Sequence, residues 1–266
     1  MQIIPEPYSV ERRALMMALG VTVKVSEKTS GFGGALKIHR EIMDALGPGK
    51  SWMPMQFGNP ANIRAHLEAT GPEIWEQCGG KIDAIVAGYG TGGTLSGITR
   101  FLRSKNPGFR CIAVEAMENS QLNGDKPGPH GIQGISPPFV PENMRVEEVD
   151  EVLRCPTAKA METARALART EGIAVGISAG ANVWGACQVA RRPEFRGKRI
   201  VTILPSAAER YMSTNLYKDL LDEAKNLPTT AFDPETKIDP GMKANMHSLA
   251  SHKEAGTVFR EGFRVV

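Results

Sequence analysis

The amino-acid sequence predicts an α/β fold in which parallel sheets are covered by helices. Short apolar segments alternate along the chain with longer segments of helical spacing, a pattern typical of parallel sheets. The segment 157–170, for example, places Met161, Ala164 and Leu167 on one helical face and ends at Gly172. The expected strands are 82–88, 110–115, 173–178 and 199–204, and the expected helices between them are 94–104, 157–171 and 180–191.

The first 50 residues predict a smaller set of the same elements. Residues 1–7 resemble the end of a buried strand, and a helix follows with Ser9 as its expected N-cap and Gly20 as its stop. Residues 21–25 alternate as a strand does, and a second helix is expected at 35–46.

The region 123–141 is a long loop rich in glycine and proline, and loops of that length are often functional. From residue 222 the pattern fades among prolines and polar residues. We therefore expect 222–266 to be a loosely ordered polar tail.

Composition narrows the class of protein. The 266 residues are 41% hydrophobic and 23% charged, which is ordinary for a soluble globular protein. Basic residues are scattered among acidic ones and the net charge is only +3, so nucleic acid is not an expected partner. No apolar run approaches the length of a membrane span, and the N-terminus lacks the regions of a signal peptide. We expect a cytoplasmic protein with no membrane partner.

The cysteines and histidines give no sign of a metal site or a disulfide. The four cysteines are far apart, and Cys111 lies in an apolar run, so a buried thiol is the favoured interpretation. The five histidines lack metal-ligand spacing, and no metal is expected.

The most informative segment is the glycine–threonine loop at residues 90–94, which reads Gly90-Thr91-Gly92-Gly93-Thr94. It follows an expected strand and opens an expected helix, an arrangement that binds phosphate groups through backbone N–H groups and the helix dipole. No Lys-Ser/Thr pair follows it, and its glycine spacing is not that of a dinucleotide site. A nucleotide, a flavin, another phosphorylated cofactor or a plain strand-to-helix turn all fit this loop alone.

Seven motifs in order closely resemble cysteine synthase, also called O-acetylserine sulfhydrylase. This family uses pyridoxal phosphate and has the tryptophan-synthase-β-like architecture known as fold type II. The motifs lie at 6–15, 56–62, 70–75, 87–97, 126–130, 176–181 and 205–211. The resemblance implies a larger cofactor-binding domain at 55–221 and the remaining half of a smaller domain at 1–54.

The resemblance also implies the roles of individual residues. Residues 90–94 correspond to the loop that holds the cofactor's phosphate, and Ser206 to the serine that hydrogen-bonds the pyridine nitrogen. Gly176 corresponds to a loop beside the ring, and Gln56 and Phe57 to the pocket for the substrate carboxylate. Without the resemblance, an ordinary turn or helix-cap role is the favoured interpretation of Ser206, and a capping or loop role is open for Gln56.

The implied reaction is a β-replacement that forms L-cysteine from O-acetyl-L-serine and sulfide. A hydroxyl group at Ser206 leaves the pyridine nitrogen largely unprotonated, which suits elimination and replacement better than transamination. The resemblance implies a homodimer and, as a possible partner, serine acetyltransferase.

The chain departs from the family in three places. The Ser-x-Lys-Asp segment of the Schiff-base lysine and the Thr-Ser-Gly-Asn-Thr-Gly substrate loop are absent, so the sequence predicts an N-terminal truncation with no catalytic lysine. Residues 134–139 read Gly-Ile-Ser-Pro-Pro-Phe instead of the family's Gly-Ile-Gly-Ala-Gly-Phe, and the two prolines are expected to stiffen this loop. Ala208 stands where the family has a glycine, and its methyl group is expected to crowd the ring side of the site. An inactive fragment, or an enzyme that forms cystathionine or cyanoalanine, is the alternative.

Overall fold

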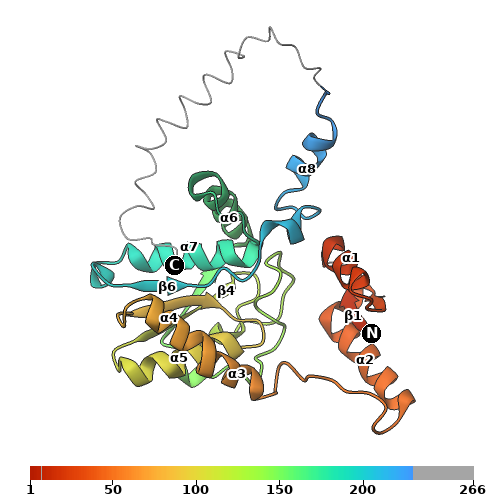
Figure 1. Cartoon of the computed structure of the whole chain (residues 1–266), viewed down its shortest axis with the longest axis horizontal. Helices are drawn as coiled ribbons and strands as arrows, with labels where there is room; N and C mark the ends of the chain where they lie inside the picture. Colours follow the sequence, from red (N-terminus) through yellow and green to blue (C-terminus); the bar gives the residue numbers. More distant parts are fainter. Residues whose placement is uncertain (7, 230–266) are drawn as a thin grey trace.

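The computed structural model describes residues 1–6 and 8–229 (Figure 1). Most of the expected polar tail, residues 230–266, lies outside the described residues. The last described helix is α8 (Lys218–Lys225), which crosses the expected start of the tail at residue 222.

The main body is built on a four-stranded parallel sheet, as the sequence predicts. Its strands are β3 (Ala84–Gly88), β4 (Arg110–Ala116), β5 (Glu151–Cys155) and β6 (Ile200–Thr202), in the spatial order β5-β4-β3-β6. Every neighbouring pair is parallel, with Ala84 opposite both Arg110 and Ile200. The carboxyl ends of β3 and β6 therefore lie side by side, although 112 residues separate Gly88 from Ile200.

Helices cover both faces of this sheet (Figure 1). One face carries α3 (Ala61–Ala65), the π-helical turn η2 (His66–Thr70), α4 (Gly71–Gln77) and α5 (Gly93–Lys105). The other face carries α6 (Thr157–Glu171) and α7 (Ile177–Ala190).

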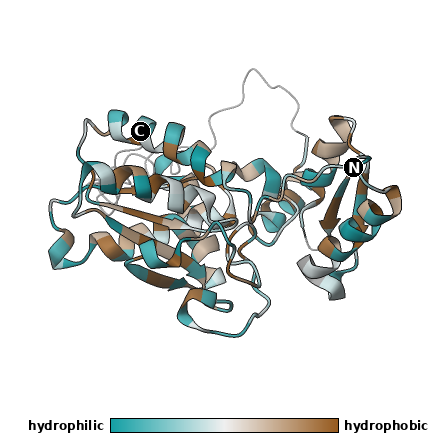
Figure 2. Ribbon diagram, turned by 90° about the horizontal axis from the view of Figure 1, so that it is seen from below, coloured by the Kyte–Doolittle hydropathy of each residue, from teal (hydrophilic) through white to brown (hydrophobic). Residues whose placement is uncertain are grey.

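Alternate residues of each strand enter the two apolar layers. Ile85 and Ala87 pack with Leu95 of α5, whereas Ala84 and Val86 pack with residues of α6 and α7. The strands are accordingly hydrophobic on both faces, and they are largely brown in Figure 2.

Two strand predictions require correction. The expected strand at 173–178 is wrong, because only Val175 forms an isolated bridge, to Ala207, before α7 begins at Ile177. Ten residues of α7 are buried, so its sequence is apolar on every side and resembles a strand where the helix starts. The strand β5 was not predicted from the sequence, because Glu151 and Arg154 interrupt its apolar pattern.

The N-terminal residues form a separate two-stranded parallel sheet, β1 (Gln2–Pro5) with β2 (Val23–Ser26). Helix α1 (Val10–Ala18) connects the strands, and α2 (Gly31–Leu46) follows the short helix η1 (Lys28–Ser30). These elements confirm the order predicted from the sequence. Ser9 occupies the N-cap of α1 but does not cap it with its side chain.

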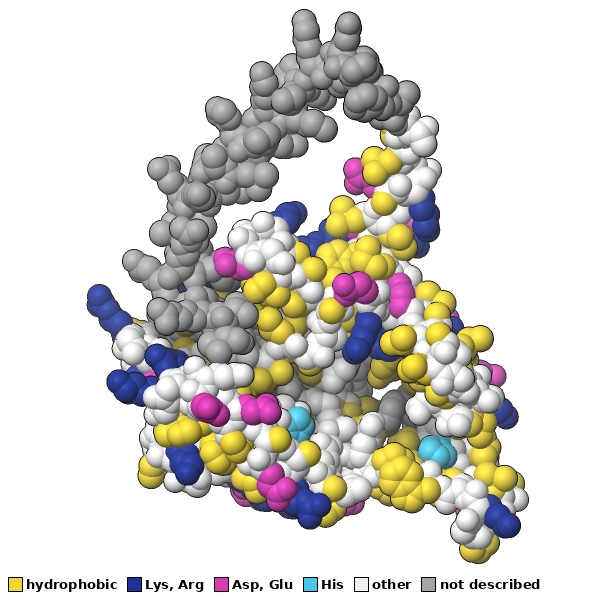
Figure 3. Space-filling model, viewed as in Figure 1, with side chains coloured by type: hydrophobic (Ala, Val, Ile, Leu, Met, Phe, Trp, Pro, Cys, Tyr) yellow, Lys and Arg dark blue, Asp and Glu magenta, His cyan; other side chains and the backbone are white. Residues whose placement is uncertain are grey.

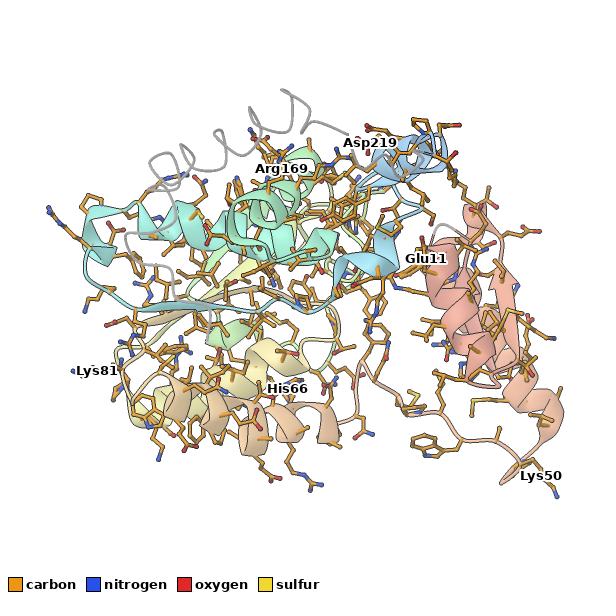
Figure 4. All side chains as sticks on the ribbon, turned by 45° about the horizontal axis from the view of Figure 1, so that its top comes forward. Glu11, Lys50, His66, Lys81, Arg169 and Asp219 are labelled. Atoms are coloured by element: carbon orange, nitrogen blue, oxygen red, sulfur yellow. The ribbon has the colours of Figure 1, made fainter. Side chains whose placement is uncertain are left out.

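The N-terminal elements contact the main body through α1. The Glu11 carboxylate accepts hydrogen bonds from the Ser213 backbone N–H at 2.6 Å and from the Ser213 hydroxyl at 2.8 Å. In Figure 4, Glu11 points from α1 toward the segment that precedes α8. The remaining short helices are η3 (Gln121–Asn123), η4 (Val146–Glu148), η5 (Pro193–Phe195) and η6 (Ala208–Tyr211).

Within residues 1–6 and 8–229, no helix combines the length and apolar character needed to cross a membrane.

Candidate functional site

A cavity of about 1300 Å³ opens at the carboxyl ends of β3 and β6, between the sheet and the N-terminal elements. Gly90, Thr91 and Thr94 of the glycine–threonine loop line it, and so does Ser206, which follows β6. Ligands of parallel α/β sheets bind outside the carboxyl ends of the strands, and this cavity has that position.

The glycine–threonine loop can adopt its path because its glycines lack side chains. A Cβ atom on Gly90 would lie 2.5 Å from the carbonyl oxygen of Gly134, and Gly92 has a φ of +86°. The loop leads directly into α5, whose first N–H groups have no acceptor within the helix. Those N–H groups, the helix dipole and the threonine hydroxyls together form a site for an anion.

The charged side chains around the cavity also favour an anion. Among the described residues, its lining includes four cationic side chains, Arg12, Arg13, Lys28 and Arg210, and one carboxylate, Glu6. An excess of positive charge in a concave site raises the local concentration of anions.

Gly176 lies directly behind Ser206, which lines the cavity. The Gly176 N–H donates a hydrogen bond to the Ser206 carbonyl oxygen at 2.9 Å, and the hydroxyls of Ser206 and Tyr211 are 2.9 Å apart. A Cβ atom on Gly176 would lie 2.2 Å from the Tyr211 ring and 2.5 Å from the Ser206 hydroxyl oxygen. Glycine at position 176 therefore leaves room for both side chains.

Arg12 connects helix α1 to this group. Its guanidinium lies 4.6 Å from the centre of the Tyr211 ring and donates hydrogen bonds to Ser9 at 2.8 Å and to Gln133 at 2.7 Å. The Ser9 hydroxyl thus accepts from Arg12 instead of capping α1.

Gln56 and Phe57 also line the cavity, from the segment that connects the two sheets. The Gln56 carbonyl oxygen accepts hydrogen bonds from the side-chain amides of Asn62 and Asn143, each at 2.9 Å. The Phe57 ring meets the Phe139 ring edge-on, with centroids 5.1 Å apart. This segment is therefore held against the loop at 134–139.

The altered loop at 134–139 is held by Ser136, which has a positive φ of 52°. A serine in this conformation is strained relative to glycine. Its hydroxyl compensates by accepting a hydrogen bond from the Ala116 N–H at 2.8 Å, while its own N–H donates to the Tyr89 carbonyl oxygen at 2.9 Å. Pro137 and Pro138 line the cavity, which is consistent with a stiffened wall.

The expected crowding by Ala208 is wrong. Ala208 is 7% exposed, packs in the apolar layer beneath α7, and is absent from the cavity lining. Its methyl group therefore faces core residues instead of the site.

A buried carboxylate stabilises the start of the glycine–threonine loop. Glu115 is fully buried and accepts hydrogen bonds from the hydroxyls of Tyr89 and Ser120, both at 2.6 Å, and from the Leu122 N–H. Burial and this bond raise the pKa of Tyr89, so the phenol remains a donor. Tyr89 directly precedes Gly90, and its fixed ring anchors the loop.

Thiol and metal chemistry have no support among the described residues. Burial raises the pKa of Cys111 to about 11 and that of Cys155 to about 12, which keeps both thiols protonated. In the described part of the chain no group of histidines, cysteines and carboxylates is arranged to hold a metal ion.

The structure brings all nine predicted site residues to this region, and it adds others that the sequence did not reveal. Asn182 accepts from the Gly88 N–H and donates to the Ile203 carbonyl oxygen, each at 2.7 Å, and so ties the ends of β3 and β6 to α7. The other residues whose roles the sequence did not reveal are Asn62, His66, Arg12 and Tyr211. Arg12, Asn62 and Tyr211 lie inside the motifs at 6–15, 56–62 and 205–211, but the resemblance gave them no role, and His66 lies outside every motif.

An anion site at a helix N-terminus, with a hydroxyl group after the neighbouring strand, is the arrangement of a site for a phosphorylated ligand. The chain belongs to the family of pyridoxal-phosphate dependent enzymes, whose family model matches residues 3–206. The predicted fold, cofactor and family resemblance are thereby confirmed.

Relatives of this chain carry more specific names. It is 44% identical over 231 residues to cysteine synthase 3 of Caenorhabditis elegans, an alignment that covers 87% of this chain and 68% of the relative. Cysteine synthase of Entamoeba histolytica has a similar structure, with a TM-score of 0.76, 36% identity, and coverage of 86% of this chain and 77% of that one. The O-acetylserine dependent cystathionine β-synthase of Helicobacter pylori gives a TM-score of 0.75 and 36% identity, with coverage of 81% and 69%.

Proposed function

We propose that this protein acts in cysteine formation, by a pyridoxal-phosphate dependent β-replacement that joins sulfide to the three-carbon unit of O-acetyl-L-serine. The observation that carries the proposal is that the glycine–threonine loop and Ser206, from neighbouring strands, line one positively charged cavity. The names of the relatives support the choice of reaction.

The residues present fit two parts of the cofactor, its phosphate group and its pyridine nitrogen. Residues 90–94 would hold the phosphate, because Gly90, Thr91 and Thr94 line the cavity and the first N–H groups of α5 have no acceptor within the helix. Ser206 would hydrogen-bond the pyridine nitrogen, with Gly176 beside the ring. When bound, pyridoxal phosphate supplies an electron sink that weakens the bonds at the amino acid's Cα atom.

The chain's own side chains would then orient the amino-acid substrate. Gln56 and Phe57 lie on the part of the wall that the family resemblance assigns to the substrate carboxylate, and the cationic lining favours that group. The Phe139 ring packs edge-on against Phe57 and so supports the Phe57 side chain at this wall. Tyr211 shares a hydrogen bond with Ser206 and so limits the directions in which the serine hydroxyl can point.

The proposal extends to organisation and partners. Residues 1–54 would form part of a smaller domain and residues 55–221 the cofactor-binding domain, because the two sheets are separate. Hydrophobic surface is visible over the N-terminal elements at the right of Figure 3. Leu15 and Met17 of α1 and Trp52 after α2 are exposed apolar side chains of this part of the chain. They support the proposal of a homodimer, which light scattering would test. Serine acetyltransferase as a partner is an expectation from the family resemblance, and a cytoplasmic location is an expectation from the sequence composition.

The experiment is a titration of the 266-residue chain with pyridoxal phosphate, followed by absorbance, borohydride reduction and peptide mapping. The sequence contains no Ser-x-Lys-Asp segment, and Lys28 is the one lysine among the described residues that line the cavity. Mapping shows whether reduction attaches the cofactor to Lys28, to another lysine, or to none. Lys28→Arg is the matched variant.

Cysteine formation from O-acetyl-L-serine and sulfide would support the proposed reaction. Faster product formation with homocysteine or cyanide would instead favour the cystathionine- or cyanoalanine-forming alternative. Cofactor binding without any β-replacement product would identify a non-catalytic protein, and no binding at all would refute the proposed function.

A further inference from the structure

Two polar side chains behind the glycine–threonine loop contact its two threonines. The Asn62 amide nitrogen lies 2.8 Å from the Thr91 hydroxyl oxygen, and His66 Nε2 lies 3.0 Å from the Thr94 hydroxyl oxygen. Asn62 and His66 are four residues apart and share one helical face, and neither lines the cavity. They therefore reach the anion site only through the two threonine hydroxyls.

The direction of the Asn62 bond is fixed by its second partner. The same amide nitrogen lies 2.9 Å from the Gln56 carbonyl oxygen, which can only accept a hydrogen bond. The NH₂ group must therefore face both oxygens, and Thr91 is the acceptor. The Thr91 hydroxyl hydrogen is then left to point elsewhere, and Thr91 lines the cavity.

The direction of the hydrogen bond between His66 and Thr94 depends on which ring nitrogen of His66 carries the hydrogen. Burial lowers the pKa of His66, so the ring is neutral near pH 7, with one nitrogen a donor and the other an acceptor. Nδ1 lies 2.9 Å from the Thr70 hydroxyl oxygen. If Nδ1 accepts from Thr70, then Nε2–H donates to Thr94, and the Thr94 hydroxyl hydrogen is free to point into the cavity.

Close packing holds both side chains in place. A Cβ atom on Gly93 would lie 2.0 Å from the Asn62 side-chain oxygen, and one on Gly97 would lie 2.6 Å from the His66 Cβ atom. These two glycines let α5 approach the helix that carries Asn62 and His66. His66 begins the π-helical turn η2, and π-helical turns are frequent at functional sites. Figure 4 shows His66 where these helices meet.

We propose that Asn62 and His66 are positioning residues, which donate to Thr91 and Thr94 so that both threonine hydroxyls donate in turn to the phosphate of a bound ligand. This inference rests on the proposed phosphate site. A phosphate dianion accepts hydrogen bonds and donates none at neutral pH, so two threonines turned the other way would present only lone pairs to it.

The first test reads the tautomer of His66 in the ligand-free chain, by ¹⁵N nuclear magnetic resonance of the histidine rings, with His66→Gln used to assign the signal. We expect hydrogen on Nε2. Hydrogen on Nδ1 would mean that Thr94 donates to the ring, and this result would overturn the assignment. The measurement requires no cofactor and no activity.

The second test compares the affinities of variants for pyridoxal phosphate, pyridoxal and inorganic phosphate. His66→Leu and Asn62→Ala each remove one donor, and we expect each to weaken pyridoxal phosphate and inorganic phosphate about tenfold, with little effect on pyridoxal. His66→Gln keeps a donor and should recover most of the loss. Asn62→Asp replaces the donor with an acceptor and should weaken phosphate more than Asn62→Ala. Arg64→Ala, on the outward face of the same helix, is the control.

Two results of this comparison would overturn the inference: equal losses for pyridoxal and pyridoxal phosphate, or unchanged phosphate affinity in both Asn62→Ala and His66→Leu. The failure of the proposed function gives a different outcome. If the wild-type chain binds neither pyridoxal phosphate nor inorganic phosphate, the proposed phosphate site is refuted, and the tautomer measurement still decides the orientation of Thr94.

Discussion

Replacing Gly176 with alanine tests whether the space beside Ser206 and Tyr211 is required. Gly176 has a φ of −80°, which any residue adopts, so the new methyl group costs nothing in backbone strain. Its Cβ atom would instead lie 2.2 Å from the Tyr211 ring and 2.5 Å from the Ser206 hydroxyl oxygen, and one of the side chains must move.

The size of the effect follows from two opposing contributions. Overpacking a buried site typically costs about 1–3 kcal/mol. Replacing glycine with alanine at an unstrained position stabilises by about 0.4–1 kcal/mol, through the unfolded chain. The net expectation for Gly176→Ala is a loss of roughly 0.5–2 kcal/mol in the free energy of unfolding, together with weaker binding of pyridoxal phosphate because Ser206 is displaced.

Urea unfolding measures the first effect and a pyridoxal phosphate titration the second. Gly108→Ala is the matched control, because Gly108 does not line the cavity, its φ is outside the left-handed region, and its added Cβ atom meets only the Asn106 side-chain oxygen at 3.5 Å. We expect the control to gain about 0.4–1 kcal/mol and to bind the cofactor normally. If Gly176→Ala behaved like Gly108→Ala in both assays, the contact between Gly176, Tyr211 and Ser206 would not constrain the site.

Three further predictions concern the residues around the cavity. Ser136→Ala keeps the positive φ but removes the acceptor of the buried Ala116 N–H, and should lower the free energy of unfolding in urea by about 1–3 kcal/mol. Arg12→Met should cost about 1 kcal/mol through its contact with the Tyr211 ring, and a variant as stable as wild type would show that this contact contributes nothing. Burial lowers the pKa of His66 and His130. As the pH falls, the unfolded chain therefore takes up protons at these histidines before the folded chain does. The free energy of unfolding should be full above about pH 6.5 and should fall as the pH drops through the folded pKa values. Urea midpoints between pH 7.5 and 5 measure this loss, and a His66→Gln chain with the same pH dependence as wild type would exclude His66 as a contributor.

The local parts of the fold could be predicted because each element carries its own signal. The glycine–threonine loop is preceded by an apolar strand and followed by a helical pattern, and glycine at position 92 matches its left-handed conformation. The strand β5 carries no comparable signal, since it lies at the sheet edge and its Glu151 pairs with Arg192 at 2.6 Å. An edge strand accepts charged side chains more readily than a central strand does.

The candidate site could be predicted only in part, because half of it depends on distant contacts. Ser206 and Gly176 were found through motif order, although their 2.9 Å backbone hydrogen bond has no sequence signature. His66 and Asn62 lie about 30 residues before the threonines that they contact. A π-helical turn has no known composition pattern that would have revealed His66.

The strand order β5-β4-β3-β6 has a consequence for the order of synthesis. The glycine–threonine loop leaves the ribosome early, but its neighbour β6 and the following Ser206 emerge more than a hundred residues later. Until then β3 has one exposed edge, and the cavity lacks the wall that follows β6. A nascent chain stalled before residue 200 therefore contains the glycine–threonine loop but not the complete pocket, and the last strand of the sheet decides when both walls of the cavity are present.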